Sequence, residues 1–216
     1  MKLLSRRGIL GSFPIFGVVA RGAEAGFRPL FDGRSLEGWR LYRGRGPGYV
    51  VQGGSIVCPA DGGGNLYTER EFDDFTLRLE WRFWEGGNNG IGIRTPMGGH
   101  ASTTGMEIQI LDDESAKYKG RLKPAQYTGS VYSVVAARQG FVKRDGVWNT
   151  FEITAYGPRI HVVLNGESIT DADLSQVRDR EVLAQHPGIR RAKGHIALLG
   201  HGTHVEFRNL RVREGF

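Results

Sequence analysis

The stretch FDDFTLRLEWRFW, residues 72–84, contains an unbroken alternation of apolar and polar side chains from Phe75 to Phe83. Its apolar positions are Phe75, Leu77, Leu79, Trp81 and Phe83. Because successive side chains of a strand point to opposite faces, this period of two predicts a long β-strand. One face of that strand must lie in a core and the other must meet solvent or a partner. The chain must therefore build a sheet with a buried side.

The same alternation recurs in WNTFEITAYG, RIHVVLNG and HVEFRNLRVRE, and shorter strand candidates are YVVQGGSIVC, NGIGIRTP, MEIQIL, SVYSVV and GHIALLG. Between the candidates lie turn signals, namely Asp61-Gly62, Asn89-Gly90, Asp145-Gly146 and Asn165-Gly166. The best helical repeat covers only residues 174–185. Many strands and few helices predict an all-β fold, a sandwich of two antiparallel sheets. A concave outer face of such a sandwich would suit an elongated ligand such as a sugar.

The first 25 residues read as an export signal and not as part of the fold. They combine a basic start, an apolar run from Gly8 to Ala20 and a small-x-small ending. The pair Arg6-Arg7 resembles a twin-arginine signal, with an ordinary secretory signal as the alternative. We therefore expect a signal peptide over residues 1–25, one domain over residues 26–216, an exported protein, periplasmic or secreted, and no transmembrane anchor after cleavage.

Charge and cysteine content exclude other classes. The signal holds four of the 29 cationic residues and one of the 23 acidic ones, which leaves 25 and 22, or a net charge of +3. These charges are interspersed, which argues against a nucleic-acid partner. The single cysteine, Cys58, excludes an internal disulfide and reads as a small apolar residue in a strand.

The segment GMEIQILDDE carries polar side chains on a strand. Glu107 and Gln109 share the face opposite Met106, Ile108 and Ile110. A β-bulge near Leu111 would bring Asp112 to the same face. With α-carbons roughly 13 Å apart, Glu107 and Asp112 would be too widely spaced for direct retaining displacement at a glycosidic bond. A solvated strand end is the alternative.

Three further residues are candidates for contacting a substrate. Arg94 alternates with Gly92 and could pair with Glu107 or bind a sugar oxygen, or it could be a surface arginine. Asn89 lies in the same polar strand, with a turn role as its alternative. Tyr132 offers an aromatic face on which a sugar ring could stack.

No cofactor is evident, but a divalent cation remains open. Asp112, Asp113 and Glu114 could bind calcium through oxygens, although aspartates are common in turns. His201 and His204 have a spacing that invites zinc, but no third ligand lies near them in the sequence. We read His201, between two glycines, as a loop histidine that could carry a proton beside the groove.

Seven segments together resemble the bacterial 3-keto-disaccharide hydrolase domain. They are FDGRSLEGW, NLYTEREFDDFTLRLEWRF, GGNNGIGIR, MEIQILDD, GSVYSVVAA, GVWNTFEITAYGPRIHVVLNG and IALLGHGTHVEFRNLRV. The resemblance implies a concanavalin A-like jelly-roll fold, as in family 16 glucanases. In those enzymes an acid stands where this chain has Gln109. The family often has Gln-Asp before the His-Gly pair, where this chain has Leu199-Gly200.

The resemblance also implies a substrate already oxidised at C3 of a sugar. A C3 ketone acidifies the C2 proton, so the C1 leaving group can depart by elimination and water can add afterwards. For this chemistry we expect Glu107 or His201 as base, Gln109 and Arg94 as substrate or enolate stabilisers, and Asp112 as acid or orienting group. Tyr132 would line the subsite.

Two other functions fit the same residues. A non-catalytic carbohydrate-binding module would keep the sandwich without turnover, and the uncharged Gln109 favours it slightly. A structural or interaction domain of the cell envelope would bind no sugar at all. Replacing Glu107 separates these alternatives, because only an enzyme would lose turnover while keeping ligand affinity.

Overall fold

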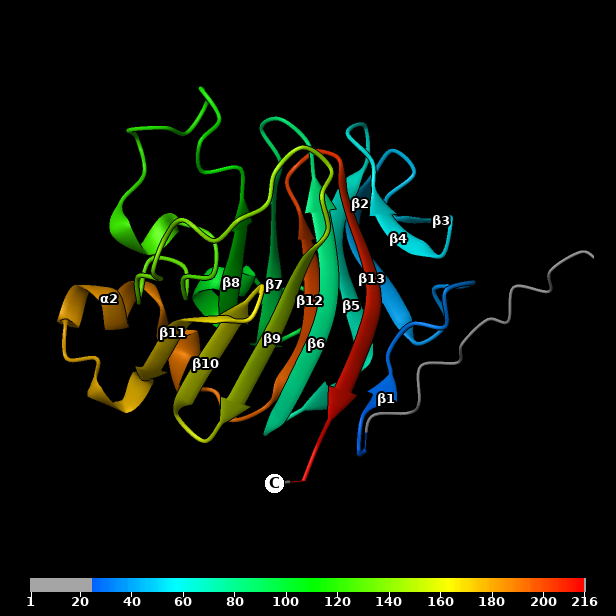
Figure 1. The fold of residues 1–216 in the computed structure, drawn as a ribbon. Coiled ribbons are helices and arrows are strands. Elements are labelled where there is room, and N and C mark those ends of the chain that lie inside the picture. Colours follow the sequence, from blue (N-terminus) through cyan, green and yellow to red (C-terminus); the bar gives the residue numbers. More distant parts are fainter. Residues whose placement is uncertain (1–24, 216) are drawn as a thin grey trace, which may run out of the picture.

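The computed structural model describes residues 25–215, so the expected signal peptide lies, apart from Ala25, outside the described residues. Two antiparallel sheets face each other across one core (Figure 1). No helix among these residues is long and apolar enough to cross a membrane.

The larger sheet has eight strands. Its order is β11 (Glu167–Asp173), β10 (Arg159–Leu164), β9 (Asn149–Tyr156), β6 (Phe75–Phe83), β13 (Val205–Arg213), β4 (Ser55–Cys58) and β3 (Val50–Gln52), with β1 (Arg28–Pro29) paired to β13. The five apolar side chains of β6 are 0–2% exposed, as the alternation predicts. The outward side chains form cross-strand ion pairs, such as Arg78 with Glu152 at 2.6 Å.

Arginine and tryptophan side chains stack on the outer surface of this larger sheet. The guanidinium of Arg208 lies 3.9 Å from the centre of the Trp148 ring, and that of Arg82 lies 4.5 Å from it. Arg82 also lies 5.2 Å from the Trp84 ring. These contacts cover apolar rings with charged groups that stay hydrated.

The smaller sheet has five strands, in the order β2 (Trp39–Arg45), β5 (Gly63–Phe72), β12 (Gly194–Gly200), β7 (Asn88–Thr95) and β8 (Met106–Leu111). Its inner face contributes Ile91, Ile93, Met106, Ile108 and Ile110 to the core. The opposite face, which we call the outer face, carries the side chains that alternate with these, among them Glu107 and Gln109.

The expected strand SVYSVV is instead a looped segment that covers the free edge of β8. The amide of Gln109 donates to the carbonyl of Ser130, and the amide of Tyr132 donates to the carbonyl of Glu107, both within 3.1 Å. An uncovered edge strand would leave these backbone groups open to pairing with another chain.

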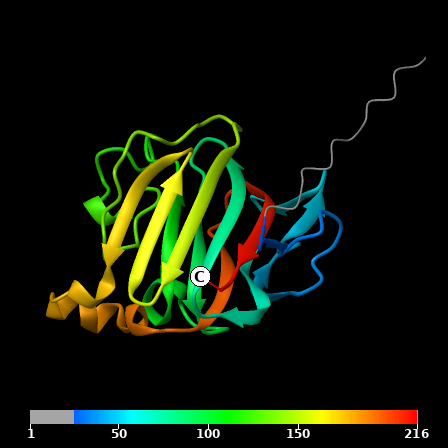
Figure 2. The same cartoon turned by 60° about the horizontal axis from the view of Figure 1, so that its bottom comes forward.

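Helices are short and lie at the periphery. They are α1 (Ala101–Thr104), η1 (Pro124–Gln126), η2 (Leu174–Gln176), α2 (Arg180–Gln185) and η3 (Pro187–Arg190). Residues 174–185, expected to be helical, hold η2 and α2, and Figure 2 shows these elements gathered at one end of the sandwich. The side chain of Asp179 caps α2 by accepting from two backbone amides. The fold is the predicted two-sheet jelly-roll sandwich.

Candidate active site

Glu107 lies on the outer face of the smaller sheet, as the strand alternation predicts. It pairs across the ladder with Gly92 of β7, and only 5% of its surface is exposed. Among the described residues, no hydrogen-bond donor reaches its carboxylate, and its one close ionisable neighbour is His201. An almost buried carboxylate without a hydrogen-bonded partner can accept a proton from a substrate.

A glycine makes room for the Glu107 carboxylate. The side chain leans over Gly90 on the neighbouring strand, and a Cβ built on Gly90 would lie 2.2 Å from Oε1 of Glu107. No side chain other than hydrogen fits at that position without displacing the carboxylate. Gly90 therefore sets where Glu107 can lie.

His201 follows the last residue of β12 and approaches Glu107 across β7, the strand that lies between β12 and β8. Its Nε2 lies 3.8 Å from Oε1 of Glu107, and its side chain is 45% exposed. Thr203 holds this turn in place, because its hydroxyl accepts from the amide of Asn88 and donates to the carbonyl of Asn88, each at 2.8 Å. One imidazole thus faces both the carboxylate and the solvent.

His204 points elsewhere and does not join this pair. Its Nε2 lies 2.9 Å from Oε1 of Glu206, and its ring packs edge-on against Trp84. The two histidines of GHGTH therefore serve different parts of the molecule.

Gln109 and Tyr132 lie next to Glu107. Gln109 is buried, and its Nε2 donates to Oδ1 of Asn88 at 3.2 Å. Tyr132 is joined to Glu107 through its backbone amide, and its hydroxyl accepts from Nε2 of Gln126 at 3.0 Å. The structure thus brings Glu107, Gln109, His201 and Tyr132 to one region.

Asp112 does not join this group. The β7–β8 register runs without a shift from Asn88↔Leu111 to Ile93↔Met106, so the expected bulge in β8 is absent. Asp112 is 1% exposed and binds Arg144 through both carboxylate oxygens, at 2.7 and 3.2 Å. It also accepts from the amide of Gly86. The Asp112 carboxylate therefore links the segment that holds Arg144 to the segment that holds Gly86.

Arg94 also lies apart from Glu107, because a bulge occurs in β7 instead. The β12–β7 register shifts between His195 and Ala197, and Arg94 has a φ of 49°. A bulge re-aims side chains. The buried guanidinium donates to Asp74 at 2.7 Å and to the carbonyls of Asp73 and Gly157. The expected pairing with Glu107 is replaced by this anchor.

Asn89 faces the core and not the substrate side. Asn88 and Asn89 begin β7 and do not form the expected turn, so Asn89 shares a face with Ile91 and Ile93. Its Oδ1 accepts from the amides of Gly90 and Leu199, at 2.9 and 3.0 Å. From the core side, Asn89 therefore links the backbone of β7 at Gly90 to the backbone of β12 at Leu199, the two strands that lie next to the site.

The acidic trio after β8 is divided among separate partners. Asp112 pairs with Arg144 and Glu114 with Lys119, whereas Asp113 accepts from the amide and hydroxyl of Thr128. Burial raises the pKa of Asp113 to about 6, and the hydrogen bonds from Thr128 act in the opposite direction. Among residues 25–215 no cluster of three or more His, Cys, Asp or Glu side chains is arranged to hold a metal ion.

Two site residues were missed by sequence reasoning. A pocket beside Glu107 and His201 is also lined by Asn65 of β5 and by His100, which precedes α1. Both follow glycines, in GGGN and GGH, where a polar residue reads as part of a loop. Only the pairing of β5 with β12 and the folding of residues 96–104 over the sheet bring them to Glu107.

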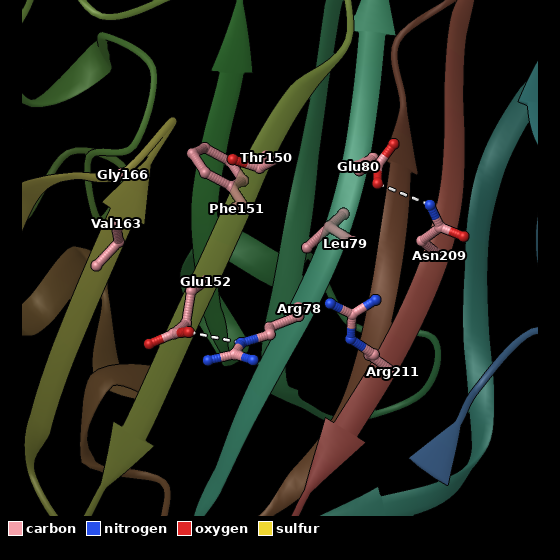
Figure 3. Close-up of a pocket in the computed structure, with 10 residues that line it drawn as sticks. All are labelled: Arg78, Leu79, Glu80, Thr150, Phe151, Glu152, Val163, Gly166, Asn209 and Arg211. Atoms are coloured by element: carbon pink, nitrogen blue, oxygen red, sulfur yellow. Dashed lines mark hydrogen bonds and ion pairs between the residues drawn. The ribbon is translucent and has the colours of Figure 1, made fainter. Parts of the chain in front are cut away.

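A separate hollow lies on the outer surface of the larger sheet, across β6, β9 and β13 (Figure 3). It encloses about 220 Å³ and is lined by hydrogen-bonded polar side chains, including the ion pair of Arg78 with Glu152 and the amide of Asn209 bound to Glu80. None of its lining residues belongs to the Glu107 region. The hollow on the larger sheet is therefore separate from the candidate site on the smaller sheet.

Comparisons with known proteins show the family and the fold of this domain. A family model described as the 3-keto-alpha-glucoside-1,2-lyase-like domain matches residues 26–213. A 3-keto-disaccharide hydrolase of Bacteroides thetaiotaomicron is 26% identical over 226 residues, which cover 87% of this chain and 78% of that protein.

Solved structures show the same architecture. A candidate glycosyl hydrolase of Parabacteroides distasonis is 27% identical, with a TM-score of 0.75 over 88% of this chain and 99% of that one. The carbohydrate-binding module CBM66 of Bacillus subtilis has a TM-score of 0.55 at 14% identity, over 82% and 96% of the two chains, which shows a shared fold alone. Because the family model spans nearly the whole described domain, the chain belongs to the family of 3-keto-alpha-glucoside-1,2-lyase-like domains, which are carbohydrate-active and hydrolase-like.

Proposed function

We propose that this protein cleaves the glycosidic bond of 3-keto-glycosides, such as 3-keto-disaccharides, by elimination followed by hydration. The observation that carries the proposal is the pair of Glu107 and His201, whose Oε1 and Nε2 lie 3.8 Å apart on the outer face of the smaller sheet. Family membership supports the substrate class.

In the proposed first step the Glu107 carboxylate removes the proton at C2 of the keto-sugar. Electrons of the C2–H bond form the C1=C2 bond, and the C1–O bond breaks. His201, which is exposed on one side, would supply the proton that the leaving oxygen needs. The buried amide of Gln109 lies on the same strand face and is our candidate for binding the enolate or a nearby hydroxyl.

This assignment does not need a second carboxylate close to Glu107. Direct displacement in a retaining enzyme calls for two carboxyl groups about 5 Å apart. Asp112, the expected second acid, is engaged with Arg144 instead. The arrangement thus favours proton abstraction over displacement.

We also propose that the protein is exported, on the strength of its first 25 residues. The basic start, apolar run and small-residue ending are the features that support this. A fusion of residues 1–25 to a reporter that is active only outside the cytoplasm tests the proposal. Replacing Arg6 and Arg7 by lysine would then separate the twin-arginine route from the general secretory route.

The decisive experiment supplies residues 26–216 with a 3-keto-disaccharide or with its unoxidised parent, and follows the released sugars. We expect release from the ketone alone. Glu107→Gln should lower kcat by roughly 10²–10⁴-fold while ligand affinity is retained. Glu167→Gln, at an exposed position of β11, is the matched control.

Other outcomes would contradict the proposal. Release from the unoxidised parent would point to displacement at C1. Saturable binding without release from either sugar would make the protein a carbohydrate-binding module. Running each reaction with and without a chelator tests whether a divalent cation takes part.

A further inference from the structure

A small pocket opens beside the Glu107 carboxylate on the outer face. It is lined by Asn65, His100, Ala101, Glu107, Leu199 and His201. Ala101 opens helix α1 and His100 precedes it. Asn65, Glu107 and Leu199 come from strands β5, β8 and β12, and His201 directly follows β12. Three of the five strands of the smaller sheet thus contribute to it.

The size of the pocket decides what it can hold. It offers about 40 Å³ of space that a water molecule can reach. One water molecule needs roughly 10–15 Å³ on this measure, whereas pockets for drug-sized ligands enclose roughly 300–1,000 Å³. The pocket therefore accommodates a few water molecules, and a sugar ring must lie outside it.

The lining is polar enough to hold a water molecule, which needs two to four hydrogen-bonding partners. Nδ2 of Asn65 donates to the hydroxyl of Tyr67 at 3.3 Å, which leaves Oδ1 of Asn65 to accept. Nδ1 of His100 lies 3.0 Å from the hydroxyl of Ser102, which fixes the ring and leaves its second nitrogen. The Glu107 carboxylate and Nε2 of His201 complete the set.

We propose that this pocket holds the water molecule that completes the reaction, with Asn65 and His100 as its positioning residues. The inference rests on the proposed function, because it assigns the source of the hydration step. Water held beside Glu107 and His201 is next to the groups that take up and return protons.

The hydration step balances without any further reactant. Elimination leaves a C1=C2 bond conjugated to the C3 ketone. The oxygen of the pocket water bonds to C1, and one of its protons passes to the Glu107–His201 pair. A proton returned to C2 then restores the single bond. The sum of both steps is one glycoside and one water in, one 3-keto-sugar and one alcohol out.

Filling the pocket should uncouple the two steps. In Ala101→Val, two added methyl groups occupy the space next to Glu107. We expect the initial rate of alcohol release to stay within about threefold of wild type, while the rate of 3-keto-sugar formation falls about tenfold or more. The unsaturated sugar should accumulate. Ala136→Val, at an exposed position, is the matched control.

Asn65→Leu provides a second test that does not crowd the site. Leucine has a similar size but cannot accept a hydrogen bond, so the unsaturated sugar should accumulate again. The purified unsaturated sugar can also be supplied directly, and its hydration should be slower with both variants than with wild type. Thermal melting of each variant checks that the chain has folded.

The result that overturns the inference is distinct from failure of the proposed function. If folded Ala101→Val and Asn65→Leu form alcohol and 3-keto-sugar in equal amounts and as fast as wild type, the pocket does not supply the water. An equal loss of both products would mean that the pocket receives a substrate hydroxyl instead. If the wild-type protein releases no alcohol from a 3-keto-disaccharide, the proposed function itself fails.

Discussion

Gly90 lies directly beneath the carboxylate of Glu107, so close that a Cβ on Gly90 would be 2.2 Å from Oε1 and 2.9 Å from Cδ. Two neighbouring strands thereby share one site, since β7 supplies the space that β8 fills. The relationship makes the position of the proposed base depend on a residue that has no functional group.

Gly90→Ala should therefore impair catalysis without unfolding the protein. The added methyl group must push the Glu107 carboxylate aside, and a displacement of about 1 Å at a reacting group can cost on the order of 10²-fold in rate. We expect kcat on a 3-keto-disaccharide to fall roughly 10–100-fold. Steady-state kinetics and a melting curve measure the two effects.

Gly92→Ala is the matched control on the same strand and face. The nearest atoms to a Cβ there would belong to Ala197, Thr95 and Ala101, at 3.1, 3.2 and 3.5 Å, whereas a Cβ on Gly90 would lie 2.2 Å from Glu107. This variant should keep its kcat, with a small loss of stability. Equal loss of activity in both variants would show that the effect of Gly90→Ala comes from general distortion of β7.

Asp112→Asn should affect stability and leave catalysis unchanged. The buried carboxylate accepts from Arg144 and Gly86, and a hydrogen bond to a charged group contributes about 1.5–3 kcal/mol. We expect the free energy of unfolding to fall by roughly 1–3 kcal/mol, because Arg144 is partly exposed and solvent screens the pair. Turnover per folded molecule should stay within about twofold. A loss of kcat without loss of stability would return Asp112 to the mechanism.

Arg94→Lys should likewise destabilise the fold without changing KM. A lysine ammonium cannot reach Asp74 and two backbone carbonyls in the planar arrangement that the guanidinium uses. Leaving a buried acceptor without a donor costs about 1–3 kcal/mol. Arg40→Lys, at an exposed arginine 3.8 Å from Glu69, should show no such loss in denaturant titrations. A raised KM with Arg94→Lys would mean that Arg94 meets the substrate.

Asp113 predicts a specific dependence of stability on pH. Its pKa is raised to about 6, above the value of about 3.9 in an unfolded chain, mainly by burial. Between pH 4 and 6 the folded protein keeps a proton that the unfolded chain has lost, so this group lowers the free energy of unfolding as pH rises.

Asp113→Asn removes that effect. The variant should be more stable than wild type at pH 7, by roughly 1–3 kcal/mol, and close to it near pH 3.5, where the carboxyl is mostly protonated in both states. Urea titrations at the two pH values measure this difference. Asp61→Asn, at an exposed turn, controls for the change in net charge. A gain that is the same at both pH values would have another cause.

The architecture could be predicted from the sequence because the alternation in β6, β9, β10 and β13 is a local signal. The site could be predicted only in part. Glu107 was placed correctly on its strand face, but its distance from His201 depends on the β12–β7–β8 pairing, which joins residues about 90 positions apart.

Two of the misplaced residues, Asp112 and Arg94, share a physical cause. A strand's face assignment reverses with every unpaired residue. We expected a bulge in β8, but the bulge lies in β7. Without a bulge in β8, the side chain of Asp112 points inward. The bulge in β7 directs the side chain of Arg94 away from Glu107, and Arg94 anchors a loop instead. Asn89 was expected on the substrate side, but it lies two residues before Ile91 on a regular stretch of β7 and therefore shares the core face of Ile91 and Ile93. The positions of bulges depend on tertiary packing.

The tryptophans stacked on the larger sheet give the protein a built-in optical reporter. Trp39 and Trp81 lie in the core, whereas Trp84 and Trp148 lie under arginines on the face opposite the proposed site. None of these four, which are all the tryptophans of the chain, lines the pocket beside Glu107. Intrinsic fluorescence should therefore follow unfolding with little interference from a bound sugar, so that stability and ligand binding can be recorded separately in one sample.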